Sequence, residues 1–103
     1  MNAHIEIPQE ELAAFCQRWQ IVELAFFGSV LRDDFRPDSD VDVLVRFHPQ
    51  AGHTLLDMVR MQGALSQILG REIDLVERAA VEQSRNYIRR KSILQSAEVI
   101  YAA

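Results

Sequence analysis

Apolar and polar residues alternate along this chain with periods that predict both helices and strands. Apolar residues at helical spacing follow Pro8 and predict a helix over about residues 9–19. The mostly apolar segment that follows predicts a short buried strand at Ile21–Phe27. Residues 40–47 follow a period of two, so they predict a strand with one apolar face and another face that begins with two acids.

The second half of the chain continues the same mixture. Apolar residues at helical spacing predict a long helix from Leu55 to Leu69 that ends at Gly70. Thr54 and Asp57 resemble a capping box in which Asp replaces the usual Glu. The last segments predict a strand, a helix and a short tail strand, over about residues 72–77, 82–95 and 98–101.

Between the first two strands, the chain has turn and capping residues. Gly28 ends the first strand, Ser29 is a suitable N-cap for a short helix over 30–34, and residues 36–39 have turn chemistry. The order of elements predicts an α/β (α+β) fold with a small mixed β-sheet flanked by helices. We expect a single domain over residues 1–103.

Composition restricts the classes of function. The chain of 103 residues has a formal net charge of −4, which disfavours a general polyanion-binding surface. Cys16 is the only cysteine, so an intramolecular disulfide and a cysteine zinc cluster are excluded, and a buried inert thiol is expected. Residues 1–11 lack the basic start and the apolar run expected of a signal peptide, and no apolar run approaches membrane-spanning length. We expect a cytoplasmic protein without direct nucleic-acid or membrane binding.

Acidic residues on the predicted strands suggest a metal site. Asp40 and Asp42 lie at alternate positions of one strand, so they project from one face with Cα atoms about 7 Å apart. Asp74 on the next predicted strand is the best third ligand if the two strands pair, and Glu72 is the competing one. Such carboxylates can bind two Mg²⁺ ions in a phosphoryl-transfer site.

The turn after the first strand suggests a phosphate site. Gly28 lets a phosphate approach the backbone closely, and Ser29 at a helix start offers its N–H and hydroxyl to an anion. Arg32 lies one helical turn later, where it can reach a phosphate oxygen or pair with Asp33 or Asp34. A triphosphate tail fits this turn.

These motifs together resemble a known family. Gly28-Ser29, ten intervening residues and Asp40-Val41-Asp42 resemble the signature of the polymerase-β nucleotidyltransferase superfamily, with Asp74 in the expected order. The resemblance covers roughly residues 21–77. The short chain resembles the minimal nucleotidyltransferases, many of which are antitoxins paired with HEPN ribonuclease toxins. The resemblance implies a polymerase-β-like nucleotidyltransferase fold.

The resemblance also implies a reaction. Gly28 and Ser29 would hold the β and γ phosphates of ATP, Asp40 and Asp42 would bind Mg²⁺, and Asp74 would help bind metal and activate the acceptor hydroxyl. AMP would pass to a tyrosine hydroxyl of a HEPN toxin and inactivate it. Two alternatives stay open at this point: an antitoxin that acts by occlusion alone, and a small-molecule nucleotidyltransferase of the aminoglycoside-modifying type.

Two further expectations concern the surface. The cluster Arg89-Arg90-Lys91 is the expected contact surface for the partner, together with its apolar neighbours Tyr87, Ile88, Ile93 and Leu94. The three histidines, His4, His48 and His53, lie in a terminus and a loop and are expected to be solvated.

Overall fold

The computed structural model describes residues 7–28 and 40–103, which form alternating helices and strands. In chain order the elements are α1 (Gln9–Arg18), β1 (Ile21–Phe27), β2 (Val41–Phe47), α2 (Leu55–Leu69), β3 (Ile73–Glu77), α3 (Arg78–Glu82), α4 (Tyr87–Ser96) and β4 (Glu98–Ala102). The predicted bounds of the first five elements agree with these to within about one residue. The predicted helix at 30–34 and turn at 36–39 lie outside the described residues.

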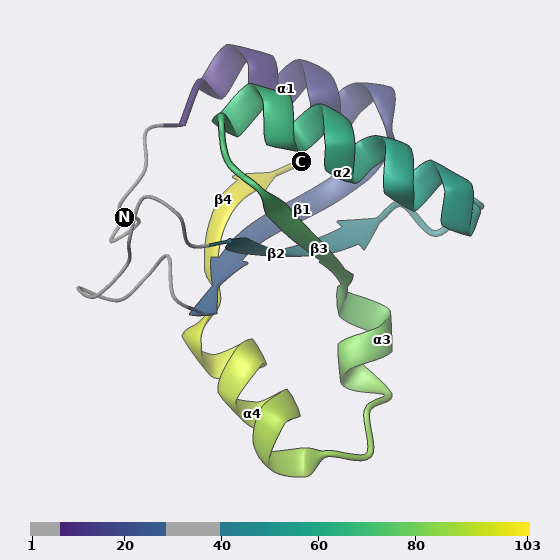
Figure 1. Ribbon diagram of the computed structural model, residues 1–103. Coiled ribbons are helices and arrows are strands. Elements are labelled where there is room, and N and C mark those ends of the chain that lie inside the picture. The colour runs from purple at the N-terminus through teal and green to yellow at the C-terminus, as the bar shows by residue number, and fades with distance from the viewer. Residues whose placement is uncertain (1–6, 29–39) are drawn as a thin grey trace.

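The described strands form one mixed sheet in the order β3-β2-β1-β4. β1 pairs antiparallel with both β2 and β4, whereas β3 is parallel to β2. A parallel pair needs a crossover connection, which α2 provides (Figure 1). The predicted α+β architecture with a small mixed sheet is therefore confirmed.

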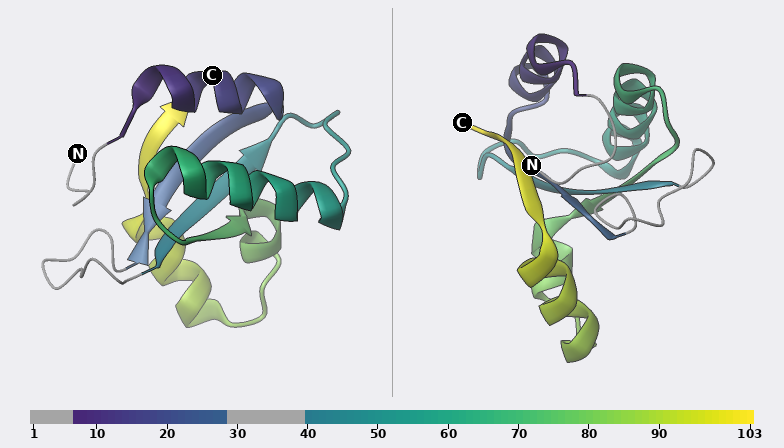
Figure 2. Two further views of the ribbon diagram at one scale, coloured as in Figure 1. Left: turned by 45° about the horizontal axis from the view of Figure 1, so that its top comes forward. Right: turned by 90° about the vertical axis from the view of Figure 1, so that its left-hand side faces the viewer.

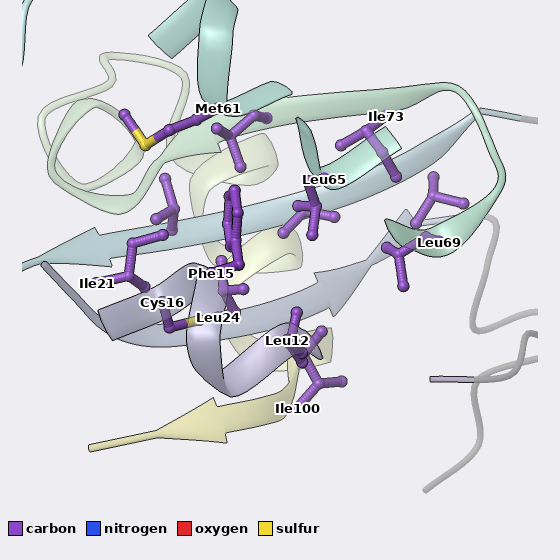
Figure 3. Packing of buried hydrophobic residues seen from close by; sticks show 14 of the residues in the cluster. Leu12, Phe15, Cys16, Ile21, Leu24, Met61, Leu65, Leu69, Ile73 and Ile100 are labelled. Atoms are coloured by element: carbon purple, nitrogen blue, oxygen red, sulfur yellow. The ribbon is translucent and has the colours of Figure 1, made fainter. Parts of the chain in front are cut away.

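The helices cover the two faces of the sheet unequally. α1 and α2 lie side by side over one face, whereas α3 and α4 project from the other (Figure 2). The main core lies under α1 and α2, where Leu12, Leu24, Met61 and Leu65 are fully buried (Figure 3). A smaller cluster lies on the opposite face and contains Ala25, Phe27, Leu44, Val81 and Ile93. Alternate residues of β1 and β2 supply the two clusters because strand side chains alternate between faces.

The long helix has the ends that its sequence predicted. The Thr54 hydroxyl accepts from the Asp57 backbone N–H at 3.2 Å, and the Asp57 carboxylate accepts from the Thr54 N–H at 3.0 Å. This pair is a complete capping box. Gly70 ends α2 in the left-handed conformation with φ 67°. Both predictions are confirmed.

The predicted helix over residues 82–95 is wrong at its start. Helix α3 comes earlier and ends at Glu82, and α4 begins only at Tyr87. The Asn86 carboxamide accepts from the Arg89 N–H at 3.1 Å, so Asn86 is the N-cap that begins a new helix. The apolar spacing predicted one continuous helix, but capping by Asn86 starts a separate helix at Tyr87.

Two expectations about the chain's chemistry can be compared with the structure. Cys16 is fully buried in the main core, and burial raises the pKa of its thiol to about 12, in agreement with an inert side chain. In the described part of the chain, no helix has both the length and the apolar character that are needed to cross a membrane.

Candidate active site

Asp42 and Asp74 lie side by side in the sheet. They are register partners in the parallel pairing of β2 with β3, so the condition on which Asp74 was the best third acid is met. Neighbouring strands are about 4.8 Å apart, and register partners point to the same face. The two carboxylates therefore share one face of the sheet.

That face is the one opposite α1 and α2. The next residues on the same side are Leu44 on β2 and Val76 on β3, which belong to the smaller apolar cluster, whereas Val41 and Val43 point into the main core. Asp42 is half-buried and Asp74 is exposed. We call this side of the sheet the acid face.

Asp40 and Glu72 lie next to each other just before the same two strands. The Val41 N–H donates to the Glu72 carbonyl at 2.9 Å, a bond that belongs to the pairing of Val41 with Ile73. Both residues are exposed. The register places Asp74 beside Asp42, and the bond from Val41 brings the backbone of Glu72 close to that of Asp40, so both candidate third acids lie near the predicted pair.

Gly28 brings the turn after β1 against Asp42. Its φ of 75° lies in the left-handed region, and a Cβ built there would overlap the Asp42 Oδ2 atom and lie 3.3 Å from its Cγ. The carboxylate thus occupies the space that a side chain at residue 28 would need. Glycine is required here both by the backbone conformation and by this close approach. The predicted phosphate turn and the predicted metal ligand are in direct contact.

The acids fit a magnesium ion by their chemistry. In the part of the chain that the structure describes, His, Cys, Asp and Glu side chains form no group of three that could hold a metal ion. Mg²⁺ is commonly held by one or two carboxylates together with substrate phosphates, so a complete protein cage is not needed. The adjacent Asp42 and Asp74, with the Gly28 turn against Asp42, match that arrangement. The other predicted phosphate ligands, Ser29 and Arg32, lie outside the described residues.

His53 differs from the solvated histidine that the sequence led us to expect. Its side chain is only 13% exposed, its Nε2 atom lies 2.5 Å from the Trp19 carbonyl oxygen, and its Nδ1 atom lies 3.7 Å from an Asp57 oxygen. The ring also makes edge contacts with Trp19 and Phe47 at centroid distances of 5.7 and 4.8 Å. Residues far apart in sequence make these contacts, so no local pattern could have shown them. By contrast, His48 is exposed as expected.

One cavity among the described residues lies away from the acids. It has a volume of about 470 Å³ and lies between the ends of β2 and β3 and the start of α2, where Arg46, Phe47, His53, Met58 and Glu77 are among its lining residues. Asp42 and Asp74 lie at the other ends of those strands. The cavity and the candidate site therefore lie at opposite ends of β2 and β3.

The predicted contact surface on α4 is only partly exposed. Tyr87 and Ile88 are 59% and 80% exposed, as expected, but Ile93 is buried in the smaller apolar cluster and Leu94 packs against it. Placing Ile93 on a contact surface was therefore wrong. Ile93 faces the sheet, where it is buried against the apolar side chains of the smaller cluster on the acid face.

Comparisons of sequence identify related proteins. A family model described as "Nucleotidyltransferase domain" matches residues 10–99. A Methanocaldococcus jannaschii protein, provisionally named a protein adenylyltransferase, is 40% identical over 52 residues, which are 50% of this chain and 54% of that protein. Protein adenylyltransferase MntA of Thermococcus cleftensis is 33% identical over 66 residues, which are 64% and 65% of the two chains. The aligned chain thus spans less than two thirds of these two relatives.

Solved structures share the fold. A structure provisionally named a minimal nucleotidyltransferase is 36% identical with a TM-score of 0.66, and the match covers 87% of this chain and 86% of that one. A toxin-antitoxin structure with AMP-PNP has a TM-score of 0.69 at 12% identity and covers 94% and 75%. At that low identity, the second similarity supports the arrangement of helices and strands alone.

Proposed function

The chain belongs to the nucleotidyltransferase domain family, and we propose that it is a protein adenylyltransferase that moves AMP from ATP to a hydroxyl group of a partner protein. One observation carries the proposal: the Gly28 turn lies directly against the Asp42 carboxylate, whose register partner is Asp74. A phosphate-binding turn and a pair of metal-binding acids are the two parts that nucleotidyl transfer needs. The names of the relatives from M. jannaschii and T. cleftensis support a protein as the acceptor.

The site residues take separate roles in this proposal. Gly28 and Ser29 hold the β and γ phosphates, with Arg32 as a further phosphate contact. The three aspartates, Asp40, Asp42 and Asp74, are the residues that would hold Mg²⁺. When bound, Mg²⁺ offsets the negative charge of the phosphates. Asp74 is exposed on the edge strand, so an acceptor group from a second protein can reach it.

The proposed reaction is an in-line substitution at the α-phosphate of ATP. The acceptor oxygen forms a bond to the α-phosphorus, the bond from that phosphorus to the α–β bridging oxygen breaks, and pyrophosphate leaves. The Asp74 carboxylate accepts the hydroxyl proton, because it is the acid on the open side of the site. AMP stays on the acceptor as a phosphodiester. We propose that the acceptor is a tyrosine of a HEPN ribonuclease toxin, which the modification inactivates.

The test is transfer of AMP to the product of the neighbouring gene. The full chain is incubated with that protein, Mg²⁺ and ATP labelled on the α-phosphate, and the label on each protein is followed with time. The expected result is label on the partner that depends on Mg²⁺ and is lost in Asp42→Asn. An Arg60→Gln variant on the exposed side of α2 is the matched control and should transfer normally.

Two results would contradict the proposal. Absence of label on the partner, with both proteins folded and mixed at high concentration, would show that the chain does not modify it. Full neutralisation of the toxin by an Asp40→Asn, Asp42→Asn double variant would show that occlusion alone is sufficient.

A further inference from the structure

The positive charge of this acidic protein is concentrated in one short segment. Residues 83–97 carry four basic side chains and no Asp or Glu, whereas the rest of the chain carries seven Lys or Arg against fifteen Asp or Glu. The four basic residues are Arg85, Arg89, Arg90 and Lys91. This segment comprises the α3–α4 connection and α4, which project from the acid face of the sheet (Figure 2).

Exposed apolar side chains accompany these charges. Ile88 is 80% and Tyr87 59% exposed, and both lie in the first turn of α4. The Arg90 guanidinium and the Lys91 ammonium lie 5.4 and 5.9 Å from the centroid of the Tyr87 ring. Aromatic and arginine side chains together are typical of protein contact surfaces.

A small cavity connects this surface with the acid face. It has a volume of about 190 Å³ and lies between α3, α4 and β3. Its apolar lining comes mainly from Val76, Val81 and Ile93, and its charged lining from Arg89 and Arg90. Sites for small molecules usually exceed about 300 Å³, so this volume suits one side chain better than a nucleotide.

The cavity is close to the proposed reaction centre. Val76 lies two residues after Asp74 on the same face of β3, which corresponds to about 7 Å along the strand. The Arg78 guanidinium donates to the Glu23 carboxylate at 2.9 Å, which fixes the start of α3 against β1. A side chain held in this cavity would therefore come from a segment that passes near Asp74.

We infer that the basic surface of α4 and the connection before it docks an acidic segment of the acceptor protein, with one apolar side chain in the cavity. This surface is defined by Arg85, Tyr87, Ile88, Arg89, Arg90 and Lys91. The role as an acceptor site rests on the proposed function, whereas the binding itself does not. Acidic side chains complement the four cations. A short acidic segment can stay on the four cations, whereas RNA would extend over the rest of the protein, which is acidic and repels a polyanion.

Binding is tested with polymers of defined charge, without any transfer reaction. The probe is a short random copolymer of glutamate and tyrosine, with a lysine–tyrosine copolymer of equal length and poly(U) RNA as comparisons, each followed by fluorescence anisotropy with the full chain. The expected result is salt-dependent binding of the acidic copolymer alone. Arg89→Glu should weaken it by about tenfold or more, because charge reversal places a repulsive group beside the acidic segment.

Matched variants separate the surface from general charge effects. Arg60→Glu changes the net charge equally on the exposed side of α2 and should leave binding unchanged. Ala80→Phe keeps every charge but places a ring at an exposed residue that lines the cavity, and it should also weaken binding. Circular dichroism establishes that each variant is folded.

Three results would overturn the inference: failure of the wild-type chain to bind the acidic copolymer, equal losses in Arg89→Glu and Arg60→Glu, or tighter binding of poly(U). These outcomes are independent of catalysis. If the acidic copolymer binds as described but AMP is never transferred to a partner, the proposed function fails while the docking surface stands.

Discussion

The Asp42 carboxylate fills the space that a Cβ at Gly28 would need, so the turn after β1 lies against the start of β2. Residue 28 also has a positive φ of 75°. These two constraints have different consequences, since a positive φ affects stability at any position whereas the contact with Asp42 affects only the candidate site. Substitutions at two glycines can therefore separate them.

We expect Gly28→Ala to slow AMP transfer by about 100-fold. The added methyl must displace the Asp42 carboxylate, and misplacing a group in a reaction site by about 1 Å can reduce the rate by about 100-fold. Gly70→Ala is the control, because Gly70 has a similar φ of 67° but no atom within 4 Å of an added Cβ. Both variants should lose about 1–2 kcal/mol of stability in urea unfolding. Equal transfer rates in the two variants would contradict the role of the contact.

The third acid of the site can be identified by comparing Asp74 with Glu72. Asp74 is the register partner of Asp42, whereas Glu72 lies beside Asp40. We expect Asp74→Asn to slow single-turnover transfer by about 100-fold or more, as for the loss of a general base. Glu72→Gln should transfer at nearly the wild-type rate. The reverse order of effects would assign the role to Glu72.

His53 should contribute to stability, in contrast to His48. Its contact with the Trp19 carbonyl oxygen links the end of α1 to the start of α2, and its ring packs against Phe47. His53→Ala should therefore lower the free energy of unfolding by about 2 kcal/mol. His48→Ala, at an exposed position, should change it by less than about 0.5 kcal/mol. Similar losses in the two variants, measured in urea, would count against this structural role.

Asp57 should make stability depend on pH in the acid range. The backbone hydrogen bond from Thr54 is the largest cause that holds the pKa of Asp57 below its ordinary value of 3.8. Because the folded pKa is the lower one, the stabilisation is present above pH 4 and is lost as the pH falls through the folded value. Thermal unfolding from pH 5 to pH 2 should show a smaller decrease in melting temperature for Asp57→Asn than for the wild type. An unchanged decrease would exclude Asp57 as a source of this dependence.

The local elements were largely predictable because each has its own sequence signal. The strand at Ile21–Phe27 is apolar at every position except Glu23, and α2 has a capping box at one end and a glycine at the other. By contrast, α3 has only five residues, too few to establish a helical period, and capping by Asn86 overrode the apolar spacing that suggested one helix. Short helices are determined by the elements they pack against.

The sequence by itself determined the types of residue in the candidate site and their faces, because side chains alternate along a strand whatever the strand pairs with. Only the tertiary structure decided that Asp74 lies beside Asp42, that Asp42 rests against Gly28, and that His53 is held by Trp19. These relationships join residues 14 to 34 positions apart in the sequence, and strand register and helix packing set them. Both depend on how the whole core closes, which no local pattern contains.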